Sequence, residues 1–227
     1  MIPKQARTLL AEALGAFILI FGGTLTIAAT GVVNSGPVAH LVIALAFGLA
    51  LLAALFTFAD ISGGHFNPAV SLAMWLSRKL STKDLIGYWA AQFVGGIGAT
   101  VFVYWITTRA TVKATATQPG PTMSIATALL VEVMLTALFV FVCLKDLQAG
   151  QLGLVGVAFT LVVVHLAGIP FSGASVNPAR SFASALIGGQ WHALWIYFAG
   201  PAIGAVIAWL VHTVVVKGEL PKAPKLA

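Results

Sequence analysis

The feature that most constrains this chain is a pair of Asn-Pro-Ala triplets, Asn67-Pro68-Ala69 and Asn177-Pro178-Ala179, each following a Ser-Gly dipeptide in a very apolar sequence. Asparagine is a favoured N-cap and proline suits the first helical position, so each triplet predicts the start of a helix. The second helix can run only to about Leu186 before two glycines, a length of about 13 Å at 1.5 Å per residue. Because this is less than half of the ~30 Å hydrocarbon core of a bilayer, each triplet predicts a re-entrant half-helix.

The composition places the rest of the chain in a membrane. Of its 227 residues, 59% are hydrophobic and 8% are charged, whereas a soluble domain has about 25% charged residues. The first apolar segment superficially resembles a secretory signal, but it carries Glu12 and is too long, so we expect a retained span. Six segments approach the roughly 20 residues that a spanning helix needs, at about 6–29, 39–58, 85–107, 124–144, 152–168 and 193–216.

The order span, span, half-helix, span occurs twice along the chain. Three crossings per half turn the second copy upside down, so we predict an all-α membrane protein of six transmembrane helices and two re-entrant half-helices in an inverted repeat. We expect one domain over 1–227, with repeat 1 at about 6–107, a linker at 108–122, repeat 2 at about 123–216 and a cytoplasmic tail at 217–227. Glu12 and Glu132 are matching landmarks of the two repeats. The glycine-rich runs 95–99 and 200–205 also match, either as surfaces for close helix packing or as ordinary membrane-helix glycines.

The distribution of positive charge predicts the orientation. Arg109 and Lys113 lie on one side of the six-span arrangement, and on the other side lie Lys4, Arg7, Arg78, Lys79, Lys83, Lys145, Lys217, Lys222 and Lys225. Since positive charge is enriched in cytoplasmic loops, both termini are expected in the cytoplasm, for a multi-pass protein of a plasma or bacterial inner membrane. The net charge of +6 is thereby explained by orientation, and no nucleic-acid partner is expected.

With its two triplets, the chain resembles the aquaporins, the major intrinsic protein family, over nearly its whole length. The resemblance implies a passive channel in which water passes in single file while protons and ions are excluded, with no cofactor and in a homotetramer. Lumen-facing backbone carbonyls are expected at Gly63, Gly64, His65, Phe66, Gly173 and Ser175. The side-chain oxygens of Asn67 and Asn177 would cap their helices, leaving both NH₂ groups to donate into the pore. The positive ends of the half-helices would oppose cations there.

In this family four positions form the narrowest point, and the resemblance places them at Phe47, His165, Ala174 and Arg180. A large ring, two polar donors and little room are typical of the water-selective branch. Ser181, where glycerol-conducting relatives carry Asp, also favours water. Two residues depart from the family pattern. Ala174 replaces the usual Thr or Cys, and Asp60 stands where His is common.

Two other functions stay open at this point. A glycerol or small neutral solute facilitator of the same family is one alternative. The other is a proton-coupled transporter, since intramembrane carboxylates such as Glu12 and Glu132 often mark proton relays. The resemblance implies instead that these acids accept hydrogen bonds from the re-entrant loops. The single cysteine, Cys143, excludes an intrachain disulfide. The sequence contains no metal cluster, nucleophile elbow or phosphate loop that would support an enzyme.

Overall fold

The computed structural model describes residues 2–31 and 36–222, and over these ranges it contains helices and no strands. Six helices are long and apolar enough to cross a membrane. They are α1 (Lys4–Thr30), α2 (Pro37–Ser62), α4 (Thr82–Ile106), α6 (Ile125–Asp146), α7 (Gly150–Ser172) and α9 (Ile196–Val211), the last continuing as a π-helical turn, η1 (His212–Val216). The six predicted spans are therefore confirmed, and each boundary lies within a few residues of its expected place.

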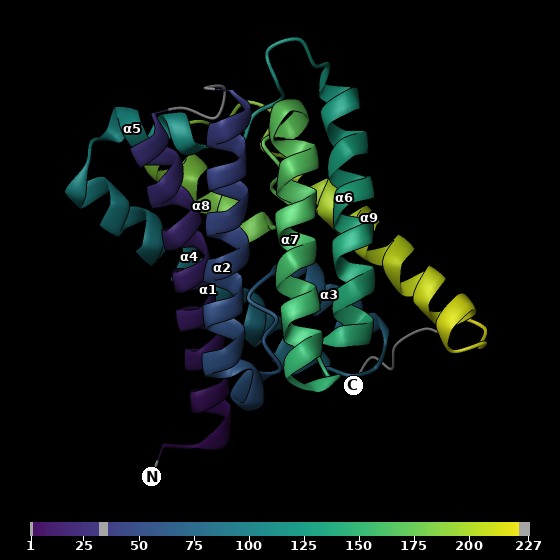
Figure 1. Ribbon diagram of the computed structural model, residues 1–227. Coiled ribbons are helices and arrows are strands. Elements are labelled where there is room, and N and C mark those ends of the chain that lie inside the picture. Colours follow the sequence, from purple (N-terminus) through teal and green to yellow (C-terminus); the bar gives the residue numbers. More distant parts are fainter. Residues whose placement is uncertain (1, 32–35, 223–227) are drawn as a thin grey trace.

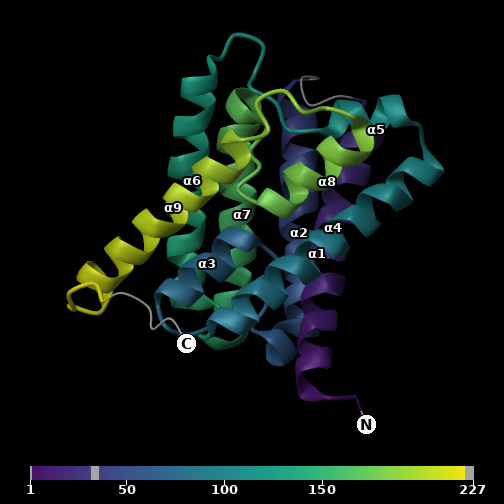
Figure 2. The same cartoon turned by 180° about the vertical axis from the view of Figure 1, so that it is seen from behind.

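Both predicted half-helices are present as α3 (Pro68–Leu76) and α8 (Pro178–Gly188). The side-chain oxygen of Asn67 accepts from the backbone N–H of Ala69 at 2.9 Å, and that of Asn177 accepts from the N–H of Ala179 at 3.0 Å. Figures 1 and 2 show α3 in the lower half of the molecule and α8 in the upper half. The local N-cap chemistry read from the triplets thus produces two short helices that approach from opposite faces.

Glycines bring the spanning helices of each repeat into close contact. A Cβ atom on Gly95 of α4 would lie 2.0 Å from the carbonyl oxygen of Ala13 in α1. At the corresponding place in repeat 2, a Cβ on Gly204 of α9 would lie 2.6 Å from the carbonyl oxygen of Val133 in α6. Because any side chain there would collide with backbone, these two glycines serve close helix packing, and the open question about them is answered.

The segment between the repeats contains a short helix, α5 (Arg109–Thr115), that the sequence did not lead us to expect. The hydroxyl of Thr108 accepts from the N–H of Thr111 at 3.1 Å and caps it. α5 packs on α8, where a Cβ on Gly188 would lie 2.7 Å from the Cα atom of Lys113. The beginning of α1 and the end of α9 point toward the same end of the molecule (Figures 1 and 2). Residues 223–227 of the expected tail, with Lys225, lie outside the described residues.

Candidate functional site

A buried carboxylate organises the loop that leads into α3. Glu12 of α1 is fully buried. Its Oε1 atom accepts from the hydroxyl of Ser62 at 2.7 Å and from the N–H of His65 at 3.0 Å. Its Oε2 atom accepts from the N–H of Phe66 at 2.8 Å and from the side-chain amide of Gln92 at 2.7 Å. Four donors from three segments therefore hold one carboxylate, and the extended loop is held with it.

Repeat 2 uses the same construction. Glu132 of α6 is fully buried. Its Oε1 atom accepts from the hydroxyl of Ser172 at 2.7 Å and from the N–H of Ser175 at 2.8 Å. Its Oε2 atom accepts from the N–H of Val176 at 2.8 Å. In both repeats the acid thus satisfies backbone N–H groups that have no partner in regular secondary structure, as the family resemblance implied.

Two tyrosines complete these networks, and sequence reasoning missed them. The hydroxyl of Tyr88 donates to the carbonyl of Ser62 at 2.5 Å, and that of Tyr197 donates to the carbonyl of Ser172 at 2.8 Å. Both tyrosines follow the half-helix of their repeat, on α4 and α9 respectively. Comparing the two repeats position by position would have matched the tyrosines, because each stands about 20 residues after its Asn-Pro-Ala triplet.

The two loops share an unusual backbone. Phe66 has φ 49° and Val176 has φ 44°, so both residues that precede the asparagines adopt the left-handed region. This region is rare for bulky and β-branched residues and persists only where surrounding contacts impose it. Here the buried glutamates hold the N–H groups of both residues. The strained geometry directs the two carbonyls across the centre of the molecule.

The two asparagines cross-link the repeats. The side-chain nitrogen of Asn67 donates to the carbonyl of Val176 at 2.8 Å, and that of Asn177 donates to the carbonyl of Phe66 at 3.1 Å. An amide nitrogen carries two hydrogens, so each asparagine retains one N–H for another acceptor. The expectation that both NH₂ groups are wholly free for the lumen is thereby corrected. The carbonyl of Phe66 likewise has a partner in the opposite repeat.

A narrow cavity runs past this junction. The volume open to the centre of a water-sized sphere is about 10 Å³, which is close to the space that one water molecule needs. The walls consist of polar residues (His65, Asn67, His165, Ser175, Asn177 and Arg180) and apolar residues (Leu19, Phe47, Leu51, Phe139, Leu161 and Val176). Seven of these were predicted as site residues. The cavity therefore has room for about one water molecule and is lined by both polar and apolar residues.

The other predicted site residues do not line this cavity. Gly63, Gly64, Phe66, Gly173 and Ala174 belong to the loops behind it, and Ala179 lies within α8. Ala174 is fully buried against α7, where a Cβ atom added to Gly168 would lie 3.0 Å from the Cβ atom of Ala174. Pro68, Ala69 and Pro178 line a separate apolar hollow with Trp89 and Phe93. None of these residues is among those that line the cavity, and the prediction that the backbone carbonyls of the loops face the lumen stays a prediction.

Phe47, His165 and Arg180 come together in the lining of the cavity. The rings of Phe47 and His165 stack with their centroids 4.3 Å apart and their planes 23° apart. The Cζ atom of Arg180 lies 5.5 Å from the centroid of the Phe47 ring. All three side chains are at least 95% buried. Because the family resemblance assigns these three positions to the narrowest point, we refer to the group as the constriction.

Polar atoms of the constriction are available to a passing molecule. Within the described residues, Nε2 of His165 and Nη1 of Arg180 are buried and have no hydrogen-bond partner. Nδ1 of His165 lies 2.9 Å from the carbonyl oxygen of Leu161. Because a carbonyl can only accept, Nδ1 carries the proton there, and Nε2 of the neutral ring is an acceptor. In this tautomer the group presents the Nη1 donor of Arg180 and the Nε2 acceptor of His165 to a passing molecule.

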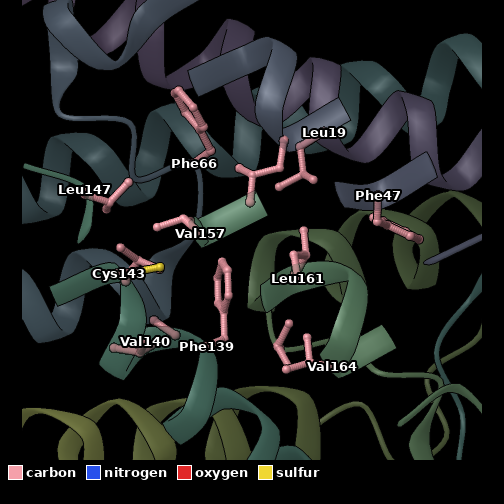
Figure 3. Packing of buried hydrophobic residues seen from close by; sticks show 14 of the residues in the cluster. Leu19, Phe47, Phe66, Phe139, Val140, Cys143, Leu147, Val157, Leu161 and Val164 are labelled. Carbon is pink, nitrogen blue, oxygen red and sulfur yellow. The ribbon is translucent and has the colours of Figure 1, made fainter. Parts of the chain in front are cut away.

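The apolar residues that line the cavity were not predicted from the sequence, although a comparison of matching positions in the two repeats would have indicated them. Leu19 and Phe139 each follow the glutamate of their repeat by seven residues, which is two helical turns on the same face. Leu51 and Leu161 each precede the asparagine of their repeat by sixteen residues. Figure 3 shows Leu19, Phe139 and Leu161, from three different helices, within one buried cluster. Matching positions of the two repeats therefore build opposite parts of the wall.

The same comparison shows that the constriction has no counterpart in the symmetry-related positions. The repeat counterparts of Phe47, His165 and Arg180 are Val157, Leu55 and Val70. All three counterparts are buried aliphatic residues. An inverted repeat provides two symmetric places for a constriction, and only one of them carries an aromatic ring and a charge.

These features define the class of protein. Six helices able to span a membrane enclose a small cavity, lined by polar and apolar residues, at the junction of two half-helices, which is the construction of an integral multi-pass membrane channel. Within the part of the chain that the structure describes, no group of three or more His, Cys, Asp or Glu side chains could hold a metal ion.

The chain belongs to the major intrinsic protein family, whose family model matches residues 2–212. It is 36% identical to Aquaporin Z of Brucella melitensis over 88% of this chain and 94% of that protein. It is 37% identical to the glycerol uptake facilitator protein-like 6 of Lactiplantibacillus plantarum over 89% of this chain and 94% of that protein. The aquaglyceroporin structure from Plasmodium falciparum has the same fold, with a TM-score of 0.79, 24% identity, and coverage of 93% of this chain and 97% of that one. Members of this family are channels, which supports a non-enzymatic function.

Proposed function

We propose that this protein is a passive water channel that conducts water in single file and excludes protons and ions. The observation that carries the proposal is the cavity itself, which has room for about one water molecule and is lined by both asparagines and by the constriction. An apolar wall binds water weakly, while a few polar atoms compensate for lost hydration. Such a lining favours rapid passage over tight binding.

The asparagine pair provides the barrier to protons in this proposal. The one remaining N–H of Asn67 and that of Asn177 donate to the oxygen of a water at the junction. Its hydrogens then point outward along the pore, which interrupts the continuous orientation that a proton relay requires. The N-termini of α3 and α8 add about half a positive charge each, which opposes hydronium and metal cations.

The constriction provides the selection by size. A water molecule can accept from Nη1 of Arg180 and donate to Nε2 of His165, while the ring of Phe47 closes the third side. Glycerol is the main alternative, and identity to relatives does not decide between the two solutes, since the two bacterial relatives match almost equally well. The close stacking of Phe47 on His165 favours water.

The buried glutamates favour a channel over a proton-coupled carrier. The oxygens of Glu12 and Glu132 all accept hydrogen bonds from loop backbone or neighbouring side chains. A carboxylate that must exchange protons with a pathway needs an accessible oxygen, and both acids are fully buried. Their role in the proposal is to hold the re-entrant loops.

The setting of the channel is proposed from the sequence and the family. A single domain over 1–227, divided into two repeats, lies in a plasma or bacterial inner membrane with both termini in the cytoplasm. The common direction of the beginning of α1 and the end of α9, together with the positive charge in the adjoining sequence, supports this orientation. We propose a homotetramer as in the family, with other small neutral solutes as secondary substrates.

Water flow without proton flow is the first expected result. Lipid vesicles that contain the purified protein should shrink in hyperosmotic buffer at least about tenfold faster than empty vesicles, because a channel removes most of the barrier to water. Stopped-flow light scattering measures the shrinkage, and a trapped pH dye measures the proton leak, which should equal that of empty vesicles. Solute uptake that saturates and follows a pH gradient would contradict the proposal and support a carrier.

Enlarging the constriction should admit glycerol. In the variant Phe47→Ala with His165→Gly, both stacked rings are removed, so glycerol flux should rise at least about tenfold while water flux persists. The matched control is Phe56→Ala, because Phe56 lies on the same helix and is 53% exposed outside the cavity. Glycerol flux that stays at the wild-type level in a water-conducting double variant would show that these rings do not form the size filter.

A further inference from the structure

The first transmembrane helix approaches the constriction without contributing a side chain to it. Gly23 of α1 faces the edge of the Phe47 ring on α2. A Cβ atom built on Gly23 would lie 2.1 Å from Cε1, 2.2 Å from Cζ and 2.4 Å from Cδ1 of that ring. Ordinary contact begins at 3.4 Å, so the ring occupies the space in which any other residue would place its side chain.

The Phe47 ring also contacts the two other residues of the constriction. Its ring stacks on His165 at 4.3 Å between centroids, and the guanidinium of Arg180 lies 5.5 Å from its centroid. The side chain is 2% exposed and lines the cavity. A ring pushed away from α1 therefore moves toward the cavity or against His165, and both movements reduce the space for a passing molecule.

Helix α1 has little room to move away from the Phe47 ring. On a second side, α1 packs against α4, where a Cβ on Gly95 would already lie 2.0 Å from the carbonyl oxygen of Ala13. A Cβ on Gly96 would lie 2.8 Å from the side chain of Ile20. Because α1 is closely packed between α2 and α4, the end of the Phe47 side chain is the part that is free to respond.

The matching positions of repeat 2 show that the absent side chain at Gly23 and the large ring at Phe47 occur together. Cys143 follows Glu132 by eleven residues, as Gly23 follows Glu12, and Val157 is the counterpart of Phe47. Cys143 and Val157 lie in one buried cluster, shown in Figure 3. The large ring of Phe47 on α2 thus goes with a glycine on α1, and its smaller counterpart Val157 on α7 goes with a residue on α6 that has a side chain.

From this packing we infer that Gly23 is a specificity-determining positioning residue, which sets the aperture of the constriction by receiving the edge of the Phe47 ring. The inference rests on the proposed function, and it extends the filter to a helix that contributes no side chain to the constriction. The size of the aperture is then a property of the contact between α1 and α2, in addition to the identities of the filter residues.

The variant Gly23→Ala tests the inference. The ring edge must move by at least about 1 Å to restore ordinary contact, and overpacking of this kind is not tolerated without displacement. Water flux per folded channel should fall about tenfold, which corresponds to about 1.4 kcal/mol in the barrier. The matched control is Gly98→Ala on α4, where a new Cβ would lie 3.6 Å from its nearest neighbour, Phe17, and flux should be unchanged.

A rescue separates an effect on the aperture from a general packing defect. In Gly23→Ala combined with Phe47→Ala, the colliding ring is absent, so water flux should return to the level of Phe47→Ala alone. Flux that is normal in Gly23→Ala, or that stays low in the double variant, would overturn the inference. If the wild type conducts glycerol and not water, the proposed function fails, and the same comparison made with glycerol still tests Gly23.

A structure of the variant provides a readout that does not depend on flux. A crystal structure of the Gly23→Ala channel should show the Phe47 ring displaced toward the cavity while the Cα atoms of α1 keep their positions relative to α4. An unmoved ring with a displaced α1 would overturn the inference, even if water flux were lower.

Discussion

Arg180→Val should convert a selective channel into a leaky one. Arginine stays charged at any physiological pH, and here Arg180 is 4% exposed and lines a cavity with room for about one water molecule. Charges in such a poorly screened place repel cations more strongly than exposed charges do. Removing the charge and the bulk together should raise proton and urea flux at least about tenfold. Water flux should persist, since Asn67, Asn177 and the apolar wall are unchanged.

The inverted repeat suggests valine as the replacement. Val70 already occupies the corresponding position of repeat 1, directly after Asn67-Pro68-Ala69, so valine is compatible with the first turn of such a half-helix. Proton, urea and water flux are compared in vesicles of equal protein density. Arg180→Lys is the control for charge, because it keeps the charge and loses the planar donor array, and it should leak less. A folded, water-conducting Arg180→Val channel with unchanged proton and urea flux would remove Arg180 from the filter.

Glu132→Leu should prevent the channel from folding stably. The substitution leaves three buried donors without an acceptor, namely the hydroxyl of Ser172 and the N–H groups of Ser175 and Val176. Each unpaired buried donor costs about 1–3 kcal/mol, so the total is several kcal/mol and comparable to the stability of a small domain. Thermal unfolding in detergent, followed by the loss of monodisperse protein, measures the effect. Met134→Leu is the matched control, because Met134 lies on the same helix and is 59% exposed.

Glu132→Gln separates the structural role from a proton relay. The amide oxygen can still accept from part of the loop, so we expect an intermediate loss of stability with water flux per folded protein preserved. A carrier would instead lose its coupling when a relay acid can no longer ionise, while remaining well folded. A stable Glu132→Gln variant that lacks transport would therefore contradict the structural role.

The comparison of the two repeats gave residue-level information that neither repeat shows alone. The paired acids Glu12 and Glu132 were recognised in the sequence, and the structure adds Tyr88 and Tyr197 as matching partners of the loops. The differences are as informative as the matches. His165 is an imidazole where its counterpart is Leu55, and because of this asymmetry the ring and the charge of the constriction have no equivalent at the matching positions of the other repeat.

The sequence by itself determined the membrane location, the six spans, the two half-helices and their inverted order. These properties depend on apolar runs and on capping between residues two or three apart, such as the bond from Ala69 N–H to Asn67, and such interactions can be read along the chain. Only the tertiary structure decided which side chains reach the cavity. It directed one N–H of each asparagine to a carbonyl of the other repeat and placed the ring of Phe47 against Gly23. Such contacts join helices distant in sequence, and their geometry depends on how closely those helices pack, which no local pattern encodes.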